Sequence, residues 1–283
     1  MIKDKHKSAY AALNCGDKDI NLSHKIVMAI LNVTPDSFYD GGVNVTERTW
    51  LQKVEQHISD GAEIIDIGAV STRPGAAEVN QDEELERLIP TIKSILKHFP
   101  ETIISVDTYR SEVAHAVIQE GACMINDISG GTFDPEIFNV VAHAQLPYII
   151  MHIKGTPGNM QKDPRYKDVT EEVYDFLHQQ TKKASQVGVS NIIWDPGFGF
   201  GKTVEHNYQL MKDLRQFKAP GHPLLVGISR KSMINAVLGT KPATALNGTS
   251  VLNTFALLNG ADILRVHDVK EAIEVVKLIE MLT

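Results

Sequence analysis

Charged and amide side chains recur along this sequence directly after short apolar runs rich in Ile, Val and Leu. A single Asp in such a place often caps a helix or holds a turn, whereas recurrence after nearly every run indicates a shared site. In chain order these residues are Asn32, Ser71 with Thr72 and Arg73, Asp107, Asn126 with Asp127, His152, Asp195, Ser229 with Arg230 and Lys231, and Arg265 with His267.

Two carboxylates and an amide, on Asp107, Asn126 and Asp195, form the first chemical group. Such groups are costly in an apolar setting unless a ligand supplies hydrogen-bond donors. A flat heterocycle with an amino-amidine edge does so, because a carboxylate can accept two parallel hydrogen bonds from it. The group therefore predicts a polar heterocycle as a ligand.

A second group, Asn32, Arg73, Arg265 and His267, suits an anion. Two Arg and a His can neutralise phosphate oxygens, and an Asn carbonyl is a hard-oxygen ligand for Mg²⁺. Alone, each Arg could equally form a surface ion pair. Together with the first group, they predict a phosphate held beside the heterocycle.

The stretch GFGFGKT, residues 197–203, resembles a phosphate-binding loop but lacks its spacing. The Walker pattern requires Gly at 196, where this chain has Pro196. We interpret the Gly-rich turn as a place where backbone and Phe200 approach a ligand. Lys202 is as readily a solvated charge as a functional one.

The apolar runs themselves are continuous rather than alternating, which is typical of parallel strands buried on both faces. Amphipathic helical patterns separate them, most clearly at residues 82–97. The runs cover residues 25–32, 63–68, 102–108, 123–127, 147–152, 191–197, 223–229 and 262–268.

About eight strands alternating with helices predict an α/β fold, a (β/α)8 TIM barrel, as a single domain over residues 1–283. A doubly wound open sheet is the alternative. It is disfavoured because no Gly-x-Gly-x-x-Gly follows the first strand and polar residues end nearly every strand. Residues 1–23 are expected to be an N-terminal extension forming a hairpin, with its turn at NCGDKD.

The composition limits the classes of partner that we expect this protein to bind. A formal net charge of −7 argues against a general nucleic-acid binder, which needs clustered Lys and Arg. The start MIKDKHKSAY lacks a secretory signal, and no run approaches the roughly 20 apolar residues that span a bilayer, so we expect a cytoplasmic protein without membrane partners. Cys15 and Cys123 are expected to be structural thiols, without a disulfide or metal.

Motifs at the strand ends resemble those of the dihydropteroate synthase family, the sulfonamide target, over residues 24–283. They are ILNVTPDSFYDGG (30–42), STRPGA (71–76), SVDTYR (105–110), INDISGG (125–131), MHIKGTP (151–157), DPGFGFGKT (195–203), GISRKSMI (227–234) and RVHDV (265–269). The resemblance implies condensation of 6-hydroxymethyl-7,8-dihydropterin pyrophosphate with p-aminobenzoate, with Mg²⁺, to give 7,8-dihydropteroate and pyrophosphate. It also implies a homodimer.

The resemblance further implies residue roles, carried over position by position. The pterin would be bound by Asp107, Asn126, Asp195, Lys231 and Arg265. Pyrophosphate would be bound by Asn32, Thr72, Arg73, Arg265 and His267, and Asn32 would also bind Mg²⁺. The p-aminobenzoate site would consist of Phe38, Thr72, Arg73, Pro74, Phe200, Lys231 and the backbone N–H of Ser232. The catalytic set is Asp107, Lys231, Arg73, Arg265 and His267.

The implied mechanism is a largely dissociative substitution at the exocyclic methylene of the pterin. It needs leaving-group stabilisation more than a strong base, which explains why the chain offers no obvious nucleophile and base pair. One departure stands out: Ala69-Val70 replaces the usual Gly-Glu of the family and removes a carboxylate that could order the second loop.

Two other functions remain open at this level. A corrinoid methyltransferase-type barrel would share the pterin contacts but needs neither NVTPDSF nor SRKS nor RVH, all present here. A non-catalytic pterin-binding protein can be separated only by an activity measurement.

Phe38 stands among Asp, Ser and Gly, where burial does not explain it. We interpret it as a lid residue that gains an aromatic partner when p-aminobenzoate binds. Phe38→Ala should raise the KM for p-aminobenzoate roughly 2- to 10-fold and raise the KM for the pterin pyrophosphate less. Steady-state kinetics with each substrate varied in turn checks this, and an equal rise in both constants would contradict it.

Overall fold

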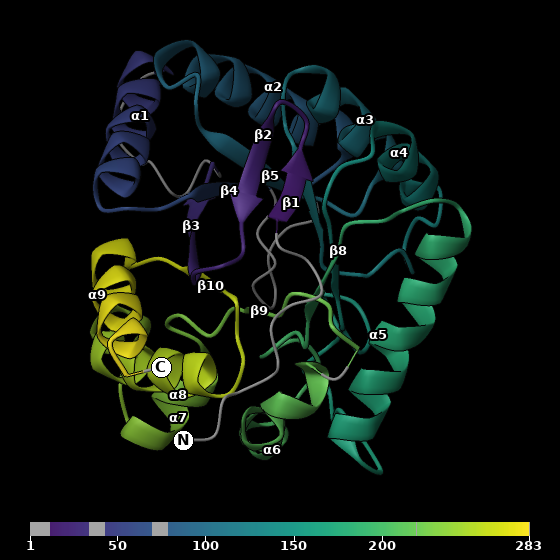
Figure 1. Ribbon diagram of the computed structural model, residues 1–283, viewed down its shortest axis with the longest axis vertical. Coiled ribbons are helices and arrows are strands. Elements are labelled where there is room, and N and C mark those ends of the chain that lie inside the picture. The colour runs from purple at the N-terminus through teal and green to yellow at the C-terminus, as the bar shows by residue number, and fades with distance from the viewer. Residues whose placement is uncertain (1–11, 34–42, 70–78, 219, 283) are drawn as a thin grey trace.

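The computed structural model describes residues 12–33, 43–69, 79–218 and 220–282, and it is a parallel barrel wrapped by helices (Figure 1). The strands are β3 (Ile26–Asn32), β4 (Ile64–Gly68), β5 (Ile103–Asp107), β6 (Met124–Asp127), β7 (Tyr148–Met151), β8 (Ile192–Asp195), β9 (Leu225–Val226) and β10 (Ile263–Val266). Their order in the sheet is β8-β7-β6-β5-β4-β3-β10-β9. A parallel bridge between Trp194 and Leu224 closes the ring.

The predicted (β/α)8 barrel is thus confirmed, and the open-sheet alternative is wrong because each strand pairs with its neighbours in chain order around a closed ring. Every predicted apolar run contains one of these strands. The helices lie outside the strands and cover them. They are α1 (Val43–Ser59), α2 (Gln81–His98), α3 (Ser111–Gln119), α4 (Ile137–Ala144), α5 (Val169–Gln186), α6 (Val204–Lys212), α7 (Ser232–Leu238), α8 (Leu246–Leu258) and α9 (Val269–Glu280), with short 3₁₀ turns at Leu214–Lys218 and Pro242–Thr244.

Successive side chains of each strand divide between two apolar cores. On β4, Ile65 and Ile67 pack outward against the helices, while Ile64 faces the barrel interior. Side chains of a strand alternate faces, so Asp66 and Gly68 share the inward face with Ile64. The interior is therefore apolar at one end of the strands and polar at the other. The inward apolar residues are Ile26, Met28, Ile64, Met124, Ile149, Ile193, Leu225 and Ile263.

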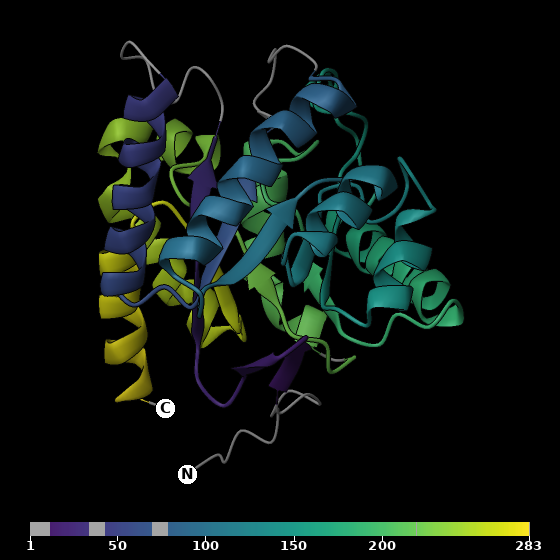
Figure 2. The same cartoon turned by 90° about the horizontal axis from the view of Figure 1, so that it is seen from above.

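An antiparallel hairpin, β1 (Ala12–Cys15) and β2 (Lys18–Asn21), closes the apolar end of the barrel. Its buried residues Leu13, Cys15 and Ile20 join the interior core, so it acts as a floor. The turn contains Gly16 at φ +74°, a left-handed conformation that glycine adopts at low cost. Figure 2 shows the hairpin at the opposite end from the tip of the β3 arrow, which confirms the predicted N-terminal hairpin.

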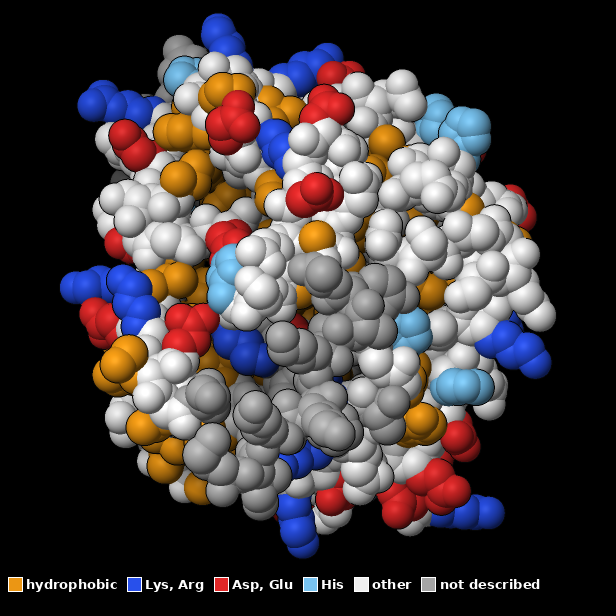
Figure 3. All heavy atoms as spheres, in the orientation of Figure 1, with side chains coloured by type: hydrophobic (Ala, Val, Ile, Leu, Met, Phe, Trp, Pro, Cys, Tyr) orange, Lys and Arg blue, Asp and Glu red, His pale blue; other side chains and the backbone are white. Residues whose placement is uncertain are grey.

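The ends of the helices follow their sequence. The α2 N-cap Asn80 accepts a hydrogen bond from the Glu83 N–H, and acidic residues fill the first turn of that helix. Asp168 caps α5 in the same way. None of the helices in the described ranges has the length and apolar character needed to cross a membrane. Acidic and basic side chains are interspersed on the face shown in Figure 3.

Candidate active site

The register of the strands sets four positions at one level of the barrel mouth. Asn32 pairs with Gly68, Gly68 with Asp107, and Asp107 with Asn126. A Cβ at Gly68 would lie 3.6 Å from Asn32 Oδ1 and 3.9 Å from Asp107 Oδ2, so the missing side chain leaves room between them. The predicted pterin and pyrophosphate residues on β3, β5 and β6 therefore lie side by side.

Arg265, on β10, crosses the mouth to two carboxylates. Its Nη2 lies 2.6 Å from Asp66 Oδ2 and 3.1 Å from Asp107 Oδ2, and its Nε donates to Asp66 Oδ2 at 2.7 Å. Asn126 Nδ2 donates to the same Asp66 oxygen at 3.1 Å. Sequence reasoning missed Asp66; the available signal was a carboxylate inside the buried run EIIDIG.

The protonation of Asp107 is set by these surroundings. Burial, together with the negative charges of Asp66, Glu84 and Asp127, raises its pKa to about 7 against the opposing effect of Arg265. A carboxylate with such a pKa gains or loses its proton near neutral pH. Perturbed values of this kind are common at functional sites.

A second set of contacts forms on the β8 side of the mouth. Lys231, which precedes α7, donates from Nζ to the Phe198 carbonyl and lies 4.5 Å from the centre of the Phe200 ring. Burial lowers the pKa of Lys231 to about 8, while Asp195 acts in the opposite sense. Asp195 Oδ1 accepts the Gly197 N–H at 2.7 Å, and burial raises the pKa of Asp195.

Lys202 lies at the base of the Gly-rich turn, and interpreting it as a solvated charge is wrong: it is 3% exposed. Its ammonium donates to His152 Nδ1 at 2.8 Å and to the carbonyls of Gly197 and Phe200 at 2.9 and 3.0 Å. A Cβ at Gly197 would lie 1.9 Å from the His152 carbonyl oxygen. The glycine lets the turn close over the lysine, and the lysine fixes the backbone that carries Phe200.

His267 follows β10 and lies against Ser229. Its backbone N–H donates to Ser229 Oγ at 3.2 Å, and its Nδ1 lies 3.0 Å from the same oxygen. The Ser229 hydroxyl can then donate to Nδ1, which favours the proton on Nε2. Burial lowers the pKa of His267 to about 4, with Arg265 acting in the same sense, so this side chain offers an anion a hydrogen bond rather than a charge.

The turn after β9 separates two neighbouring cations. Arg230 has φ +59°, and its guanidinium pairs with Asp268 through Nε at 2.8 Å and Nη2 at 2.6 Å. Lys231 is thereby directed to the mouth. Ser232, the first residue of α7, is exposed.

The structure thus brings Asn32, Asp107, Asn126, Asp195, Lys231, Arg265, His267 and Phe200 to one end of the barrel. Phe38, Thr72, Arg73 and Pro74 lie outside the described residues, as does Val70 of the Ala69-Val70 departure. The backbone on either side of residues 70–78 is held by arginines: Arg87 donates to the Ala69 carbonyl at 2.7 Å, and Arg110 to the Val79 carbonyl at 2.8 Å.

Metal binding can be tested against the donors present. Within the described ranges, no three His, Cys, Asp or Glu side chains are grouped closely enough to hold a metal ion. Mg²⁺ commonly uses one or two protein oxygens together with water and substrate phosphates, a pattern that does not require such a cluster. Asn32 Oδ1, beside Asp107 across Gly68, fits that pattern.

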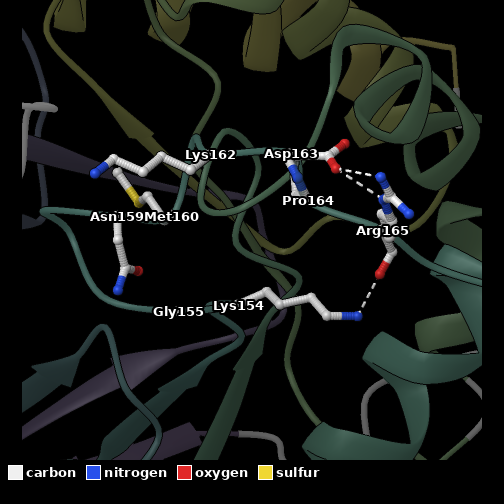
Figure 4. Close-up of a pocket in the computed structure, with 8 residues that line it drawn as sticks. All are labelled: Lys154, Gly155, Asn159, Met160, Lys162, Asp163, Pro164 and Arg165. Atoms are coloured by element: carbon white, nitrogen blue, oxygen red, sulfur yellow. Dashed lines mark hydrogen bonds and ion pairs between the residues drawn. The ribbon is translucent and has the colours of Figure 1, made fainter.

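A separate cavity of about 470 Å³ is lined by residues from the segment 154–165, which follows β7 and precedes α5 in the chain (Figure 4). None of the sequence-predicted site residues lines it. Its basic Lys154 is already engaged, with Nζ 2.5 Å from the Arg165 carbonyl and 3.0 Å from Glu172 Oε2. We therefore place the candidate active site at the barrel mouth, where polar groups from many strands converge.

Comparison with known proteins agrees with this geometry. A family profile described as "Pterin binding enzyme" matches residues 28–267. The dihydropteroate synthase of Escherichia coli K12 is 44% identical over 263 residues, which cover 92% of this chain and 93% of that protein.

Two solved structures are also similar. The Yersinia pestis dihydropteroate synthase in a sulfonamide drug complex has a TM-score of 0.90 and 40% identity, covering 96% of this chain and 98% of that one. The Xanthomonas albilineans dihydropteroate synthase with 4-aminobenzoic acid has a TM-score of 0.90 and 36% identity, covering 98% of each chain.

The buried ammonium of Lys202 generates a prediction on stability. Lys202→Met keeps the length of the side chain but removes the ammonium that donates to His152 Nδ1 and to the carbonyls of His152, Gly197 and Phe200, so it should lower the free energy of unfolding by about 3 kcal/mol. Urea unfolding followed by circular dichroism measures this. Lys182→Met, at an exposed position of α5, is the matched control and should change stability by less than about 0.5 kcal/mol. Equal effects of the two substitutions would contradict a bonding role for Lys202.

Proposed function

The chain belongs to the pterin-binding enzymes and, among them, to the dihydropteroate synthases, and from this we infer how its barrel mouth works. It is a transferase of folate biosynthesis that condenses 6-hydroxymethyl-7,8-dihydropterin pyrophosphate with p-aminobenzoate, releasing pyrophosphate and forming 7,8-dihydropteroate. The corrinoid methyltransferase alternative is not supported by these relatives.

The observation that carries our assignment of the site is the arrangement of acceptors around one guanidinium. Asp107 and Asn126 are neighbours in register, and Arg265 reaches Asp107 from the opposite side of their row. We propose that Asp107, Asn126 and Asp195 bind the amino-amidine edge of the pterin. Lys231 would contact the other polar edge, and the Arg265 guanidinium would cover the ring face.

We assign the other two ligands to the flanks of this pocket. Pyrophosphate would be held by Arg265 and by the Nε2–H of His267, together with Asn32, Thr72 and Arg73. The p-aminobenzoate site would comprise Phe200 and Lys231, which are in contact, together with Phe38, Thr72, Arg73, Pro74 and the backbone N–H of Ser232.

The proposed reaction is a largely dissociative substitution. The C–O bond at the exocyclic methylene breaks first, its electron pair leaves with the pyrophosphate oxygen, and the positive charge spreads into the pterin ring. Arg265 and His267 stabilise the departing anion, and ionised Asp107 stabilises the electron-poor ring. The amino nitrogen of p-aminobenzoate then attacks the methylene and releases its proton, so no side chain has to activate it.

Asn32 would be the protein ligand of Mg²⁺, with substrate phosphates and water completing its shell. When bound, the ion supplies neutralisation of charge on the leaving pyrophosphate. Asn32→Ala should therefore weaken Mg²⁺ binding in the presence of pyrophosphate, measured by calorimetry. An unchanged affinity would contradict this ligand.

We also propose a homodimer formed through α7 and α8. These helices expose Val237, Leu238, Val251, Phe255 and Leu258, which are 40% to 60% accessible although large and apolar. Light scattering that gives a monomeric mass at micromolar concentration would contradict it.

We further propose that residues 1–283 form a single domain, which limited proteolysis tests. We also propose a cytoplasmic location, which cell fractionation tests.

The decisive test mixes the purified protein with the pterin pyrophosphate, p-aminobenzoate and Mg²⁺ and follows pyrophosphate release and dihydropteroate formation. Lys231→Ala and Asp107→Ala should each abolish turnover while the far-ultraviolet circular dichroism stays that of the folded chain. Lys182→Ala on exposed α5 is the control and should remain active. Absence of product with the unmodified protein would overturn the function, and activity in both site variants would overturn these roles.

The titration of two site residues predicts the pH dependence of kcat/KM for the pterin. Asp107 must be ionised to accept the pterin, and because its pKa is about 7, activity should fall as the pH drops through that value. Lys231 must be charged, and because its pKa is about 8, activity should also fall as the pH rises through that value. The profile should be bell-shaped with its maximum between these values. Lys231→Arg should remove the alkaline limb, and an alkaline limb unchanged in this variant would contradict the assignment.

A further inference from the structure

One carboxylate oxygen below the mouth gathers three N–H groups from two residues of the proposed pterin site. Asp66 Oδ2 lies 2.7 Å from Arg265 Nε, 2.6 Å from Arg265 Nη2 and 3.1 Å from Asn126 Nδ2. Asp66 is fully buried in the middle of β4, so its carboxylate cannot exchange these partners for bulk water.

The position of Asp66 explains why it can bind both partners. It lies on the inward face of β4, two residues before Gly68 and hence below the row formed by Asn32, Asp107 and Asn126. Its neighbour in register, Ser105, also faces inward. Neither the Ser105 hydroxyl nor Asp66 Oδ1 has a hydrogen-bond partner among the described residues. Among the residues that the structure describes, the hydrogen-bond partners of the Asp66 carboxylate are therefore Arg265 and Asn126.

We propose that Asp66 is a positioning residue for pterin binding: it holds the Arg265 guanidinium over the mouth and orients the Asn126 amide. This inference rests on the proposed function and extends it below the ligand. Because Asp66 Oδ2 accepts from Asn126 Nδ2, the amide oxygen of Asn126 is left to face the ligand. Because Asp66 binds one edge of the Arg265 guanidinium, the guanidinium keeps a fixed plane against which the pterin ring can stack.

Asp66 also acts on Asp107 through their shared arginine. Both carboxylates contact Arg265 Nη2, so one guanidinium is divided between two negative groups. The charges that act on Asp107 come from β10, β4, α2, β6 and the turn before α7, namely Arg265, Asp66, Glu84, Asp127 and Lys231. Removing the charge of Asp66 leaves Arg265 to Asp107 alone, which favours the ionised form of Asp107.

Asp66→Asn tests the charge of this residue at nearly constant shape. The variant should raise the KM for the pterin pyrophosphate about 10-fold while the KM for p-aminobenzoate changes less. It should also move the acid limb of the kcat/KM profile to lower pH, by roughly half a unit or more. A merely structural role would lower stability without moving that limb, so an unmoved limb together with unchanged KM values would overturn the proposal.

Asp66→Glu tests the position of the carboxylate and keeps its charge. The extra methylene displaces the guanidinium, so the KM for the pterin should rise while the acid limb stays near its original pH. Asp127→Asn is the matched control: this carboxylate is equally buried on β6, two strands away from β4, but it binds Ser129 N, Gly131 N and the Tyr148 hydroxyl instead. It should lower stability and leave the KM for the pterin within about twofold. A rise in that KM equal to the one in Asp66→Asn would show a general effect of losing a buried charge and overturn the proposal.

A double-mutant cycle with Arg265→Met identifies the route of the effect. If Asp66 acts through Arg265, Asp66→Asn should weaken binding of pteroic acid about 10-fold in the unmodified chain and by less than about twofold in the Arg265→Met background. Calorimetry with pteroic acid measures both, and additive losses would overturn the route. Because this readout needs no turnover, it separates the two proposals: an unmodified protein that binds pteroic acid but forms no product contradicts the reaction, whereas additive losses contradict the positioning of Arg265 by Asp66.

Discussion

The alternation of side chains along parallel strands in a closed ring is the constraint on which this protein depends. On each strand every second residue faces the interior, and the interior must be filled or lined by those residues alone. Near the hairpin they are apolar and form the floor with Leu13 and Ile20. Further along the same faces they become Asp66, Asp107 and Asn126. The site is therefore the upper continuation of the core, and rigid strands position its polar atoms.

Placing charge in this interior creates an electrostatic problem that the protein solves by pairing. Carboxylates on β4, β5 and β8 face cations from β10 and from the segments that follow β8 and β9. Taking any of these groups out of water is expensive, and an unpaired member would cost several kcal/mol. The pairing of charges is incomplete, because the single guanidinium of Arg265 binds both Asp66 and Asp107. Burial is the main cause that raises the pKa of Asp107 to about 7 and lowers the pKa of Lys231 to about 8, and the negative charge of Asp66 adds to the rise at Asp107.

The loops after β8 and β9 solve a different problem, which is to hold an aromatic ring and a lysine against each other outside the sheet. Gly197 permits the tight approach to β7, and Lys202 fills the space beneath the turn with an ammonium that binds backbone carbonyls. Phe200 is then fixed where Lys231 can lie across it. A buried lysine used in this way explains why a stretch that resembles a phosphate loop serves as a scaffold instead.

Local sequence determined most of the fold and much of the site. Continuous β-branched runs marked the strands because parallel strands are buried on both faces, and polar residues at their ends, such as Asp107 and Asp195, marked the mouth. The resemblance of these strand-end motifs to a known family then indicated which ligands the mouth binds. What only the tertiary structure decided were contacts between distant residues. Asp66 meets Arg265 across 199 positions of sequence, and no local pattern shows which inward-facing groups closure of the ring will bring together. The burial of Lys202 is likewise invisible in GFGFGKT, because it depends on β7 lying beneath the turn.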